Sequence, residues 1–256
     1  MKIASWNVNS LRARMEHVLT WLDAQRPDVL ALQEIKMTDA EFPALEFDAL
    51  GYQAICSGQP TYNGVALLTR KDADDVVTAL PDFQDPQKRV LGAKVDGVYV
   101  LDLYVPNGQA VDSDKYRYKL EWLAQLELWL KELAREQPNL VLLGDFNVAP
   151  EDRDVHDPQA WRGSVLTSEP ERAAFQRLLS HGLKDSFRLH NETGGHYSWW
   201  DYRGAGFQRN LGLRIDHILL SAPLAERCSA AWIDREPRGW ERPSDHTPVL
   251  VELNLP

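Results

Sequence analysis

The sequence has little cysteine, no long apolar run and no excess of positive charge, and each shortage narrows the class of protein. Its 256 residues include two cysteines, Cys56 and Cys228, which form no CxxC pair. This count argues against a disulfide-stapled fold and a cysteine-based zinc site, and it predicts free thiols in a reducing compartment. No stretch approaches the roughly 18 apolar residues that a membrane span needs, and the start, MKIASWNV, enters a strand pattern without an apolar leader. We therefore expect a cytoplasmic protein without a membrane partner.

The formal net charge is −10, which argues mildly against nucleic acid as a partner because phosphate binding usually leaves a basic footprint. Clustered carboxylates that bind a divalent cation would explain part of this acidity. The hydrophobic content of 44% and the charged content of 26% are ordinary for a globular chain. Because no low-complexity linker or short repeat divides the sequence, we expect a single domain over residues 1–256.

Apolar patterns predict strands that alternate with amphipathic helices. The predicted strands are KIASWNV, DVLALQE, 64–70, 98–105, LVLL, 214–221 and 247–253, and the predicted helices are 11–25, 115–135 and 168–181. A capping box of Ser168 and Glu171 opens the last helix, and Gly182 ends it. Two rounds of strand–helix–strand, each followed by further strands, predict an α/β fold with helices covering two packed sheets. The strand order stays open.

Polar side chains stand at the ends of several of these buried runs. Strand ends and loops are where a rigid α/β scaffold usually presents its chemistry, although a single polar residue there is more often a cap or a turn former. Here such residues recur at six places, and they are rich in carboxylates and amides. They are Asn7, Glu34, Tyr104 with Asn107, Asp145 with Asn147, Asp216, and Asp245 with His246.

This set of side chains suits hydrolysis assisted by a hard metal ion. Carboxylates offer the oxygen ligands that Mg²⁺ prefers, and a bound cation would remove the repulsion between them. His246 can donate to a phosphate oxygen or shuttle a proton, and Tyr104 can hydrogen-bond a phosphate. Asp145 and Asn147 are two residues apart, so in an extended chain both side chains point to the same side. Phe146, which lies between them, should point the other way, into the core.

The motifs SWNVNS, LALQEIK, YVPNG, GDFNVAP, RIDHIL and PSDHTPV, in this order from residue 2 to residue 253, resemble the exonuclease III family of apurinic/apyrimidinic endonucleases. This family lies within the endonuclease/exonuclease/phosphatase superfamily. GDFN and SDH alone would indicate only the superfamily. LQE followed by IK, YVPNG, and YSWWDYRGAGF ahead of RIDHIL are more specific to the DNA-repair branch.

The resemblance implies a four-layer α/β sandwich of two mixed sheets flanked by helices, with the site at one edge of the sheets. It implies Mg²⁺, for which Mn²⁺ can substitute, held chiefly by Glu34. It implies that Asp145 activates water, that Asn147 and Tyr104 stabilise the phosphate, and that His246 contacts the scissile phosphate while Asp216 polarises it. In-line attack would leave a 3′-hydroxyl and a 5′-phosphate. The full predicted metal site is Asn7, Glu34, Asp145, Asn147 and Asp245.

The stretch GHYSWWDYRGAGFQRNLGLRID combines aromatic and basic residues, which suit a nucleic-acid backbone with exposed sugar or base faces. The alternative for Trp200 and Tyr202 is that they are core aromatics. By resemblance, Trp199, Leu213 and Ile215 would wall a pocket that accepts a flipped abasic sugar and excludes a base. The predicted DNA contacts are Lys36, Asn107, Trp199, Arg203, Leu213, Arg214 and Ile215.

Basic residues also lie beside the site motifs, at Arg12, Arg14, Lys115, Arg117 and Lys119, where they either contact phosphates or form a solvated helix face. A local basic strip would reconcile DNA binding with the negative total. The partner implied by the resemblance is double-stranded DNA with abasic sites or damaged 3′ ends, bound by a monomer. The chain starts without the long basic extension of animal relatives, so we expect a compact, bacterial protein.

The loop EDRDVHDP, residues 151–158, departs from the family pattern, and His156 could narrow the space beside the pocket. The balance between abasic-site incision and 3′-end trimming therefore stays open. Two other functions compete with DNA repair. One is a phosphoesterase of the same superfamily acting on lipid or inositol phosphates, against which the aromatic–arginine stretch counts. The other is a catalytically inactive relative that binds nucleic acid, against which the complete set of site residues counts.

Overall fold

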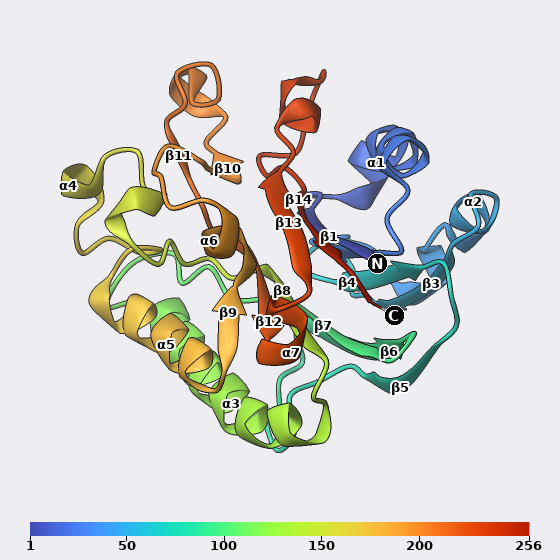
Figure 1. Ribbon diagram of the computed structural model, residues 1–256. Helices are drawn as coiled ribbons and strands as arrows, with labels where there is room; N and C mark the ends of the chain where they lie inside the picture. The colour runs from blue at the N-terminus through green and yellow to red at the C-terminus, as the bar shows by residue number, and fades with distance from the viewer. Residues whose placement is uncertain (256) are drawn as a thin grey trace.

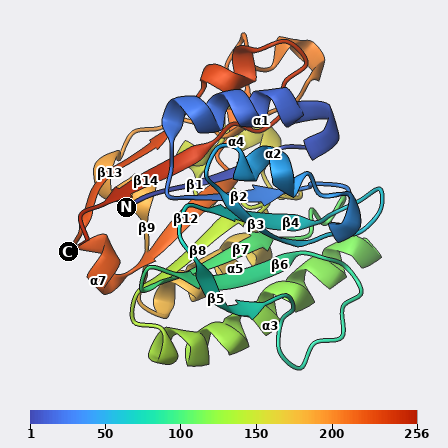
Figure 2. The ribbon, with the colours of Figure 1, turned by 90° about the vertical axis from the view of Figure 1, so that its right-hand side faces the viewer.

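In a computed structural model that describes residues 1–255, two six-stranded mixed sheets pack face to face with helices on both outer sides (Figure 1). This arrangement confirms the predicted four-layer α/β sandwich. Figure 2 shows the order of the layers, with α1 and α2 outside one sheet and α3 outside the other. Among the described residues, no helix is both long and apolar enough to cross a membrane.

Each sheet is built from strands that lie far apart in the sequence. The first sheet has the order β13 (Cys228–Ile233), β14 (Val249–Leu253), β1 (Lys2–Asn7), β2 (Val29–Gln33), β4 (Val65–Thr69) and β3 (Gln53–Ser57). The second has the order β5 (Ala73–Val77), β6 (Val90–Val95), β7 (Val98–Tyr104), β8 (Leu140–Asp145), β12 (Asp216–Ser221) and β9 (Leu183–Asp185). A separate ribbon pairs β10 (Trp199–Trp200) with β11 (Gly212–Leu213).

The helices and short 3₁₀ turns connect and cover these sheets. The helices are α1 (Leu11–Gln25), α2 (Ala44–Asp48), α3 (Asp114–Glu136), α4 (Pro158–Trp161), α5 (Glu169–Ser180), α6 (Ser186–His190) and α7 (Ala222–Ala225). The 3₁₀ turns are η1 (Asp39–Glu41), η2 (Asp152–Asp154), η3 (Arg203–Ala205) and η4 (Glu236–Gly239). The three predicted helices correspond to α1, α3 and α5, and the capping box of Ser168 and Glu171 is present at the start of α5.

Three apolar clusters hold the layers together. One lies between the sheets, where Val29, Val100 and Val141 come from β2, β7 and β8. A second packs α1 and α2 onto the first sheet, and a third packs α3 and α5 onto the second. Burial of apolar surface is worth about 25 cal/mol per Å², so these three contacts are the main stabilising term.

The seven predicted strands are present, although 214–221 begins only at Asp216 and 247–253 only at Val249. The sequence patterns missed β3, β5, β6, β9 and β13. Four of these, β3, β5, β9 and β13, are sheet-edge strands. Three of the four, β3, β5 and β13, are largely exposed or half-buried, so they lack the continuous apolar run of a central strand.

Strand register gathers the polar strand ends at one edge of the sandwich. Parallel β7 and β8 pair Tyr104 with Asp145, and antiparallel β12 pairs Asp216 with the same Asp145. In the other sheet, parallel β1 and β2 pair Asn7 with Gln33, the residue before Glu34. Five sequence motifs therefore meet at one place.

Candidate active site

Asp145 ends β8 beneath this edge and is buried, with only 1% of its surface exposed. Its Oδ1 accepts the Asn147 backbone N–H at 2.9 Å, and its Oδ2 accepts the Asn7 amide at 2.9 Å. The preceding Gly144 has a φ of 134°, and a Cβ there would lie 1.9 Å from the Leu103 carbonyl oxygen. The glycine lets β8 approach β7 closely and so sets the position of the carboxylate.

His246 and Asp216 form a buried pair beside Asp145. The imidazole Nδ1 lies 2.8 Å from Asp216 Oδ2, and Nε2 lies 3.6 Å from Asp145 Oδ2. Ser198 holds Asp216 in place, because its hydroxyl oxygen accepts the backbone N–H groups of Ile215 and Asp216 at 3.0 Å each. The Asp216 bond to Nδ1 leaves Nε2 as the ring atom that faces the site.

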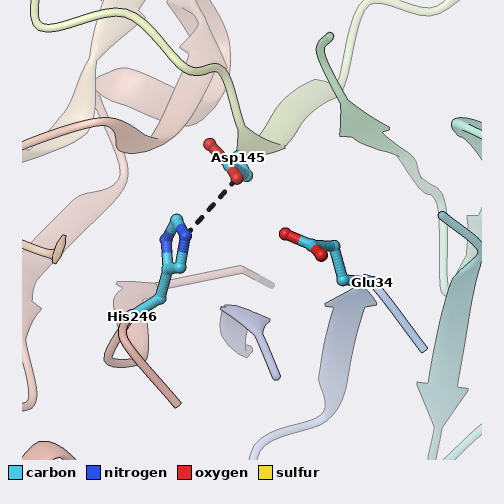
Figure 3. Close-up of side chains that lie close together, drawn as sticks. All are labelled: Glu34, Asp145 and His246. Carbon is cyan, nitrogen blue, oxygen red and sulfur yellow. Dashed lines mark ion pairs between the residues drawn. The ribbon is translucent and has the colours of Figure 1, made fainter. Parts of the chain in front are cut away.

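Glu34 completes the cluster from the other sheet. It follows β2 with a φ of 52°, a left-handed conformation that ends the strand. One ligand atom from each of Glu34, Asp145 and His246 lies within 4.8 Å of the other two. Figure 3 shows the three side chains converging, with the ion pair between His246 and Asp145 marked.

Burial and crowding shift the protonation of this cluster. Burial raises the pKa of Asp145 to about 7, and the Asp216 and Glu34 carboxylates add to the rise while His246 opposes it. Burial alone would lower the pKa of His246, but Asp216 and Asp145 outweigh it and raise that pKa to about 10. His246 is therefore an imidazolium at neutral pH, and Asp145 can take a proton near neutrality.

The donor set fits a hard divalent cation held by Glu34 and Asp145. Two carboxylates within reach of each other suit Mg²⁺, and a cation would relieve the repulsion that raises the pKa of Asp145. A protonated His246 has no free lone pair with which to bind a metal ion. Its Nε2–H can instead donate to a phosphate oxygen.

Three other predicted ligands are placed differently. The Asn7 oxygen accepts the Asn9 backbone N–H at 3.0 Å, so its amide nitrogen faces Glu34 and Asp145 instead. In this conformation Asn7 donates to the two carboxylates, and its role as an oxygen ligand stays a prediction. Asp245 lies outside the three-residue cluster, and its two oxygens accept from Asn9 and from the Trp199 indole.

Asn147 turns its side chain toward the loop after β7. Its φ is 49°, and its amide donates to the Val105 carbonyl at 2.9 Å while accepting from Asn107 at 3.2 Å. Its backbone N–H contacts Asp145, but no described side-chain contact joins Asn147 to the cluster, and its role as a ligand stays a prediction. Phe146 points into the core and packs edge-on against Phe175, as predicted.

Tyr104 lies at the end of β7, half-buried, beside Glu34. Burial raises its pKa well above the usual value, and the Glu34 and Asp145 carboxylates add to the rise, so the phenol stays a hydrogen-bond donor. Arg89 lies over the ring at 4.7 Å and donates to the Tyr104 carbonyl. A cavity of about 510 Å³ opens here, lined in part by Tyr62, Arg89, Tyr104 and Asn107.

Two basic residues that the sequence places near DNA are buried. Arg214 is 1% exposed and pairs with Asp154 and Asp185, which corrects the prediction that it contacts DNA. Lys119 is fully buried and pairs with Glu171, so neither a phosphate contact nor a solvated helix face describes it. Both cations hold the fold together beneath the site.

The predicted sugar pocket is a packed apolar cluster. Leu213 and Ile215 are at most 1% exposed and pack with Val155, while Trp199 is half-buried beside them. Trp199 and Trp161 meet edge-on at 6.5 Å, and His156 meets Trp161 at 6.4 Å. His156 thus lies one aromatic ring away from the predicted pocket wall.

The remaining predicted DNA contacts lie at the surface. Lys36 is half-buried and within 3.3 Å of Glu34, Asn107 is exposed, and the exposed Arg203 side chain pairs with Asp201. Trp200 is fully buried, as the core alternative held, but Tyr202 is 50% exposed.

Sequence reasoning missed Asn9 and Arg89. Asn9 accepts from Lys36 at 2.7 Å and donates to Asp245 at 3.1 Å, so it links two predicted site residues. The second Asn of SWNVNS was a usable signal for Asn9. No pattern signals Arg89, because its partner Tyr104, which lies on another strand, becomes a neighbour only through the pairing of β6 with β7.

Comparison with known proteins places this site in a family. Residues 4–246 match the model of the Endonuclease/Exonuclease/phosphatase family. The chain is 38% identical to exodeoxyribonuclease III of Haemophilus influenzae, over 99% of this chain and all of that one. It is 46% identical to a 3′ phosphatase from Neisseria bound to a product DNA hairpin, with a TM-score of 0.98 over both full chains. An AP endonuclease from Archaeoglobus fulgidus is 38% identical, with a TM-score of 0.96 over both full chains.

Proposed function

The chain belongs to the endonuclease/exonuclease/phosphatase family, as a DNA-repair nuclease of the exodeoxyribonuclease III type, and we propose that it hydrolyses phosphate esters at 3′ ends and at abasic sites of duplex DNA. The observation that carries the proposal is the convergence of Glu34, Asp145 and His246, with Asp216 behind the imidazole.

His246 would bind the scissile phosphate through Nε2–H, because Asp216 occupies Nδ1 and keeps the ring charged. Asp145 would accept a proton from the attacking water, and its two hydrogen bonds hold it in place for that task. Water then adds to phosphorus opposite the 3′ oxygen, the bond from phosphorus to that oxygen breaks, and the departing oxygen takes a proton from solvent. A phosphodiester would leave a 3′-hydroxyl and a 5′-phosphate, and a terminal 3′-phosphate would leave a 3′-hydroxyl and inorganic phosphate.

Glu34 and Asp145 would hold the metal ion, for which Mg²⁺ is our proposal. A bound divalent cation supplies Lewis-acid polarisation of the phosphoryl group and neutralises the charge that develops there. The chain's own residues add the Tyr104 hydroxyl and the Asn7 amide, both at the same edge.

The DNA strand would run across the cavity beside Tyr104 and Asn107. Arg89 is 8% exposed, has no carboxylate within ion-pair distance among the described residues, and lines that cavity, so it presents an uncompensated positive charge to a phosphate. This local charge supports DNA binding by a chain whose total is −10. Trp199, Lys36 and Arg203 would contact the strand on other sides of the site. The monomeric state and the cytoplasmic location remain predictions.

Processing of 3′ ends is proposed as the principal reaction, with incision at internal abasic sites as the second. A cavity of about 310 Å³ opens beside Trp199, lined in part by Trp161 and His156, but Leu213 and Ile215, the predicted walls for a flipped sugar, are covered. A terminal phosphate or nucleotide can reach Asp145 without entering that cluster. The Neisseria relative is described as a 3′ phosphatase, which supports the proposal that 3′-end processing is the principal reaction.

One panel of three duplexes tests the proposal. They share one sequence and carry a 3′-phosphate at a nick, a recessed 3′-hydroxyl end, or an internal tetrahydrofuran abasic analogue. We expect turnover in Mg²⁺ on all three, fastest on the 3′-phosphate, and none in excess EDTA. Asp145→Asn is the matched control and should lose at least a hundredfold, on the order of a general-base contribution. Turnover that survives EDTA would contradict the metal mechanism, and incision faster than 3′ processing would contradict the order.

A further inference from the structure

A second layer of polar residues lies directly beneath the site, in the otherwise apolar interface between the sheets. Side chains two residues apart on a strand share one face. Ser5 on β1 therefore lies one step below Asn7, and Asp102 on β7 lies one step below Tyr104. Gln33 ends β2 between them. Its Nε2 donates to Ser5 Oγ at 3.0 Å and to Asp102 Oδ1 at 2.8 Å.

Asp102 is a buried carboxyl group that the proposed reaction does not use. It is 0% exposed and has no ion-pair partner among the described residues. Its neighbours in register are Leu91 on β6 and Leu143 on β8. Burial raises its pKa well above the usual value, and the single Gln33 hydrogen bond only partly opposes the rise. An unpaired carboxylate in such surroundings is strongly unfavourable, because burial removes its hydration without supplying a cation.

Two atoms of this contact have no hydrogen-bond partner within residues 1–255, namely Asp102 Oδ2 and Gln33 Oε1. Both are acceptors when Asp102 is ionised, so neither can satisfy the other. They belong to the two groups that the Nε2–Oδ1 bond already joins. A single proton on Asp102 would turn Oδ2 into a donor and satisfy both atoms at once.

We propose that Asp102 keeps its proton and forms a neutral acid–amide pair with Gln33, and that this pair is a positioning device for Glu34 and Tyr104. Asp102 O–H donates to the Gln33 carbonyl oxygen, and the Gln33 N–H donates back to Asp102. The inference deepens the proposed function, on which its positioning part rests.

The position of the pair explains why it would matter to the site. Gln33 and Asp102 belong to different sheets, so their pairing ties β2 to β7 across the interface. Glu34 follows Gln33 directly, and Tyr104 follows Asp102 by two residues on the same face. The tie therefore sets the separation between a candidate metal ligand and a phosphate donor that come from opposite sheets.

The strands around Asp102 offer no cation to hold it ionised. The acidic groups on the same face of these strands and just beyond their ends are Tyr104, Asp145, Asp216 and Glu34, while the two cations at the strand ends contact other partners, Arg89 the Tyr104 ring and His246 the Asp216 carboxylate. Three of the four are carboxylates, and each lies at the site edge. On this face β6 carries Leu91, Ala93 and Val95, β1 carries Ile3, Ser5 and Asn7, and β4 carries Val65, Leu67 and Thr69, none of which is charged.

Stability measurements on Asp102→Asn test the protonation. A carboxyl group whose folded-state pKa is raised stabilises the fold at acidic pH, and this contribution is lost as pH rises from about 4, the unfolded value, toward the folded value. The amide that replaces the carboxyl group in the variant does not titrate. The urea midpoint of Asp102→Asn should therefore rise relative to wild type as pH goes from about 4 to about 8. Infrared spectra at neutral pH should show a protonated carboxylic acid band in wild type that is missing in the variant.

A pH-independent difference together with no such band would overturn the neutral pair. Neither measurement needs nuclease activity, so both remain decisive if the proposed function fails.

Kinetics on Asp102→Asn and Asp102→Leu test the positioning. An amide can replace the acid in a paired arrangement, whereas Leu cannot pair with Gln33 at all. We expect Asp102→Leu to lower kcat roughly tenfold to a hundredfold with a smaller change in KM, because Glu34 and Tyr104 lose their relative placement. Asp102→Asn should restore most of kcat. A folded Asp102→Leu protein with wild-type kcat would overturn the positioning role.

Discussion

At the scale of single residues, His246 depends on Asp216 for its charge. Burial opposes an imidazolium, and the hydrogen-bonded Asp216 carboxylate is the largest influence that restores it. The geometry is that of a carboxylate that fixes the tautomer of a histidine and stabilises its charged form, the arrangement used in many hydrolytic sites.

Replacing Asp216 with Asn should lower the pKa of His246 from about 10 toward neutrality. If the charged ring binds the phosphate, the alkaline limb of the pH profile of kcat/KM moves to lower pH, and kcat/KM at pH 8 falls. The sign follows from linkage: the charge is present below the folded pKa and lost as pH rises through it. A pH–rate profile of both proteins on the 3′-phosphate duplex measures the shift.

His181→Gln, which changes a histidine paired with Glu127 at the end of α5, serves as the control and should leave the profile unchanged. An Asp216→Asn protein with an unshifted alkaline limb would show that His246 does not act as the charged donor.

At the scale of elements, one buried ion pair joins α3 to α5 and supports two site loops. The Lys119 ammonium pairs with Glu171 and also donates to the carbonyls of Asn107 and Asn147. Burial lowers the pKa of Lys119, and Glu171 and Asp145 counter that shift. Glu171 in turn accepts the backbone N–H groups of Leu166 and Ser168, so it caps α5 as well.

Lys119→Met should destabilise the protein by about 3–5 kcal/mol, because it leaves the Glu171 carboxylate buried without its cation. Urea unfolding followed by far-UV circular dichroism measures the loss. Adding Glu171→Leu should recover part of it by removing the stranded charge. Lys131→Met, on the exposed face of the same helix, should stay within about 0.5 kcal/mol of wild type. A Lys119→Met protein as stable as this control would mean that the pair contributes nothing.

At the scale of the whole molecule, the two sheets bring candidate ligands from opposite layers to one candidate metal site. Glu34 follows β2 in the first sheet, and Asp145 ends β8 in the second. A cation bound between them would therefore link the layers as well as serve the reaction. Such binding is linked to global stability by mass action.

Mg²⁺ at a hundredfold excess over its Kd should raise Tm by roughly 5–10 °C, since such binding is worth about 2.7 kcal/mol in a domain of this size. Differential scanning calorimetry without DNA gives the shift independently of turnover. Glu34→Gln should abolish most of it, and Glu127→Gln, at a partly buried position on α3, should not. An equal shift in Glu34→Gln would place the metal elsewhere.

The distribution of charge over the whole molecule leads to a prediction about salt. Despite a net charge of −10, binding to duplex DNA should weaken as salt rises, because local cations displace counterions from phosphates. Arg203→Ala should reduce the steepness of the slope of log K against log salt by about one unit, which is the contribution of one phosphate contact. Fluorescence anisotropy with Asp145→Asn protein in EDTA measures binding without cleavage. Arg177→Ala changes an arginine that pairs with Glu127 in the outer helix layer of α3 and α5, and it should not change the slope.

Much of the site could be predicted from local sequence, since a buried run that stops at a carboxylate or an amide reports a strand end. Glu34, Asp145, Asp216 and His246 were found in this way, and strand register then brought them together. The central strands were also predictable, because both their faces are apolar. Half-exposed edge strands such as β5 and β13 carry no comparable pattern.

The sequence by itself determined the family, the α/β class and the candidate residues for the chemistry, because these follow from residue types and their order along one chain. Only the tertiary structure decided which groups are buried and which atom of each faces the site. It placed Arg214 and Lys119 inside, turned the Asn7 nitrogen toward the carboxylates, and left Asp102 facing Gln33 across the sheets. Burial and pairing depend on elements distant in sequence, so the chemical state of these groups is a property of the packed molecule.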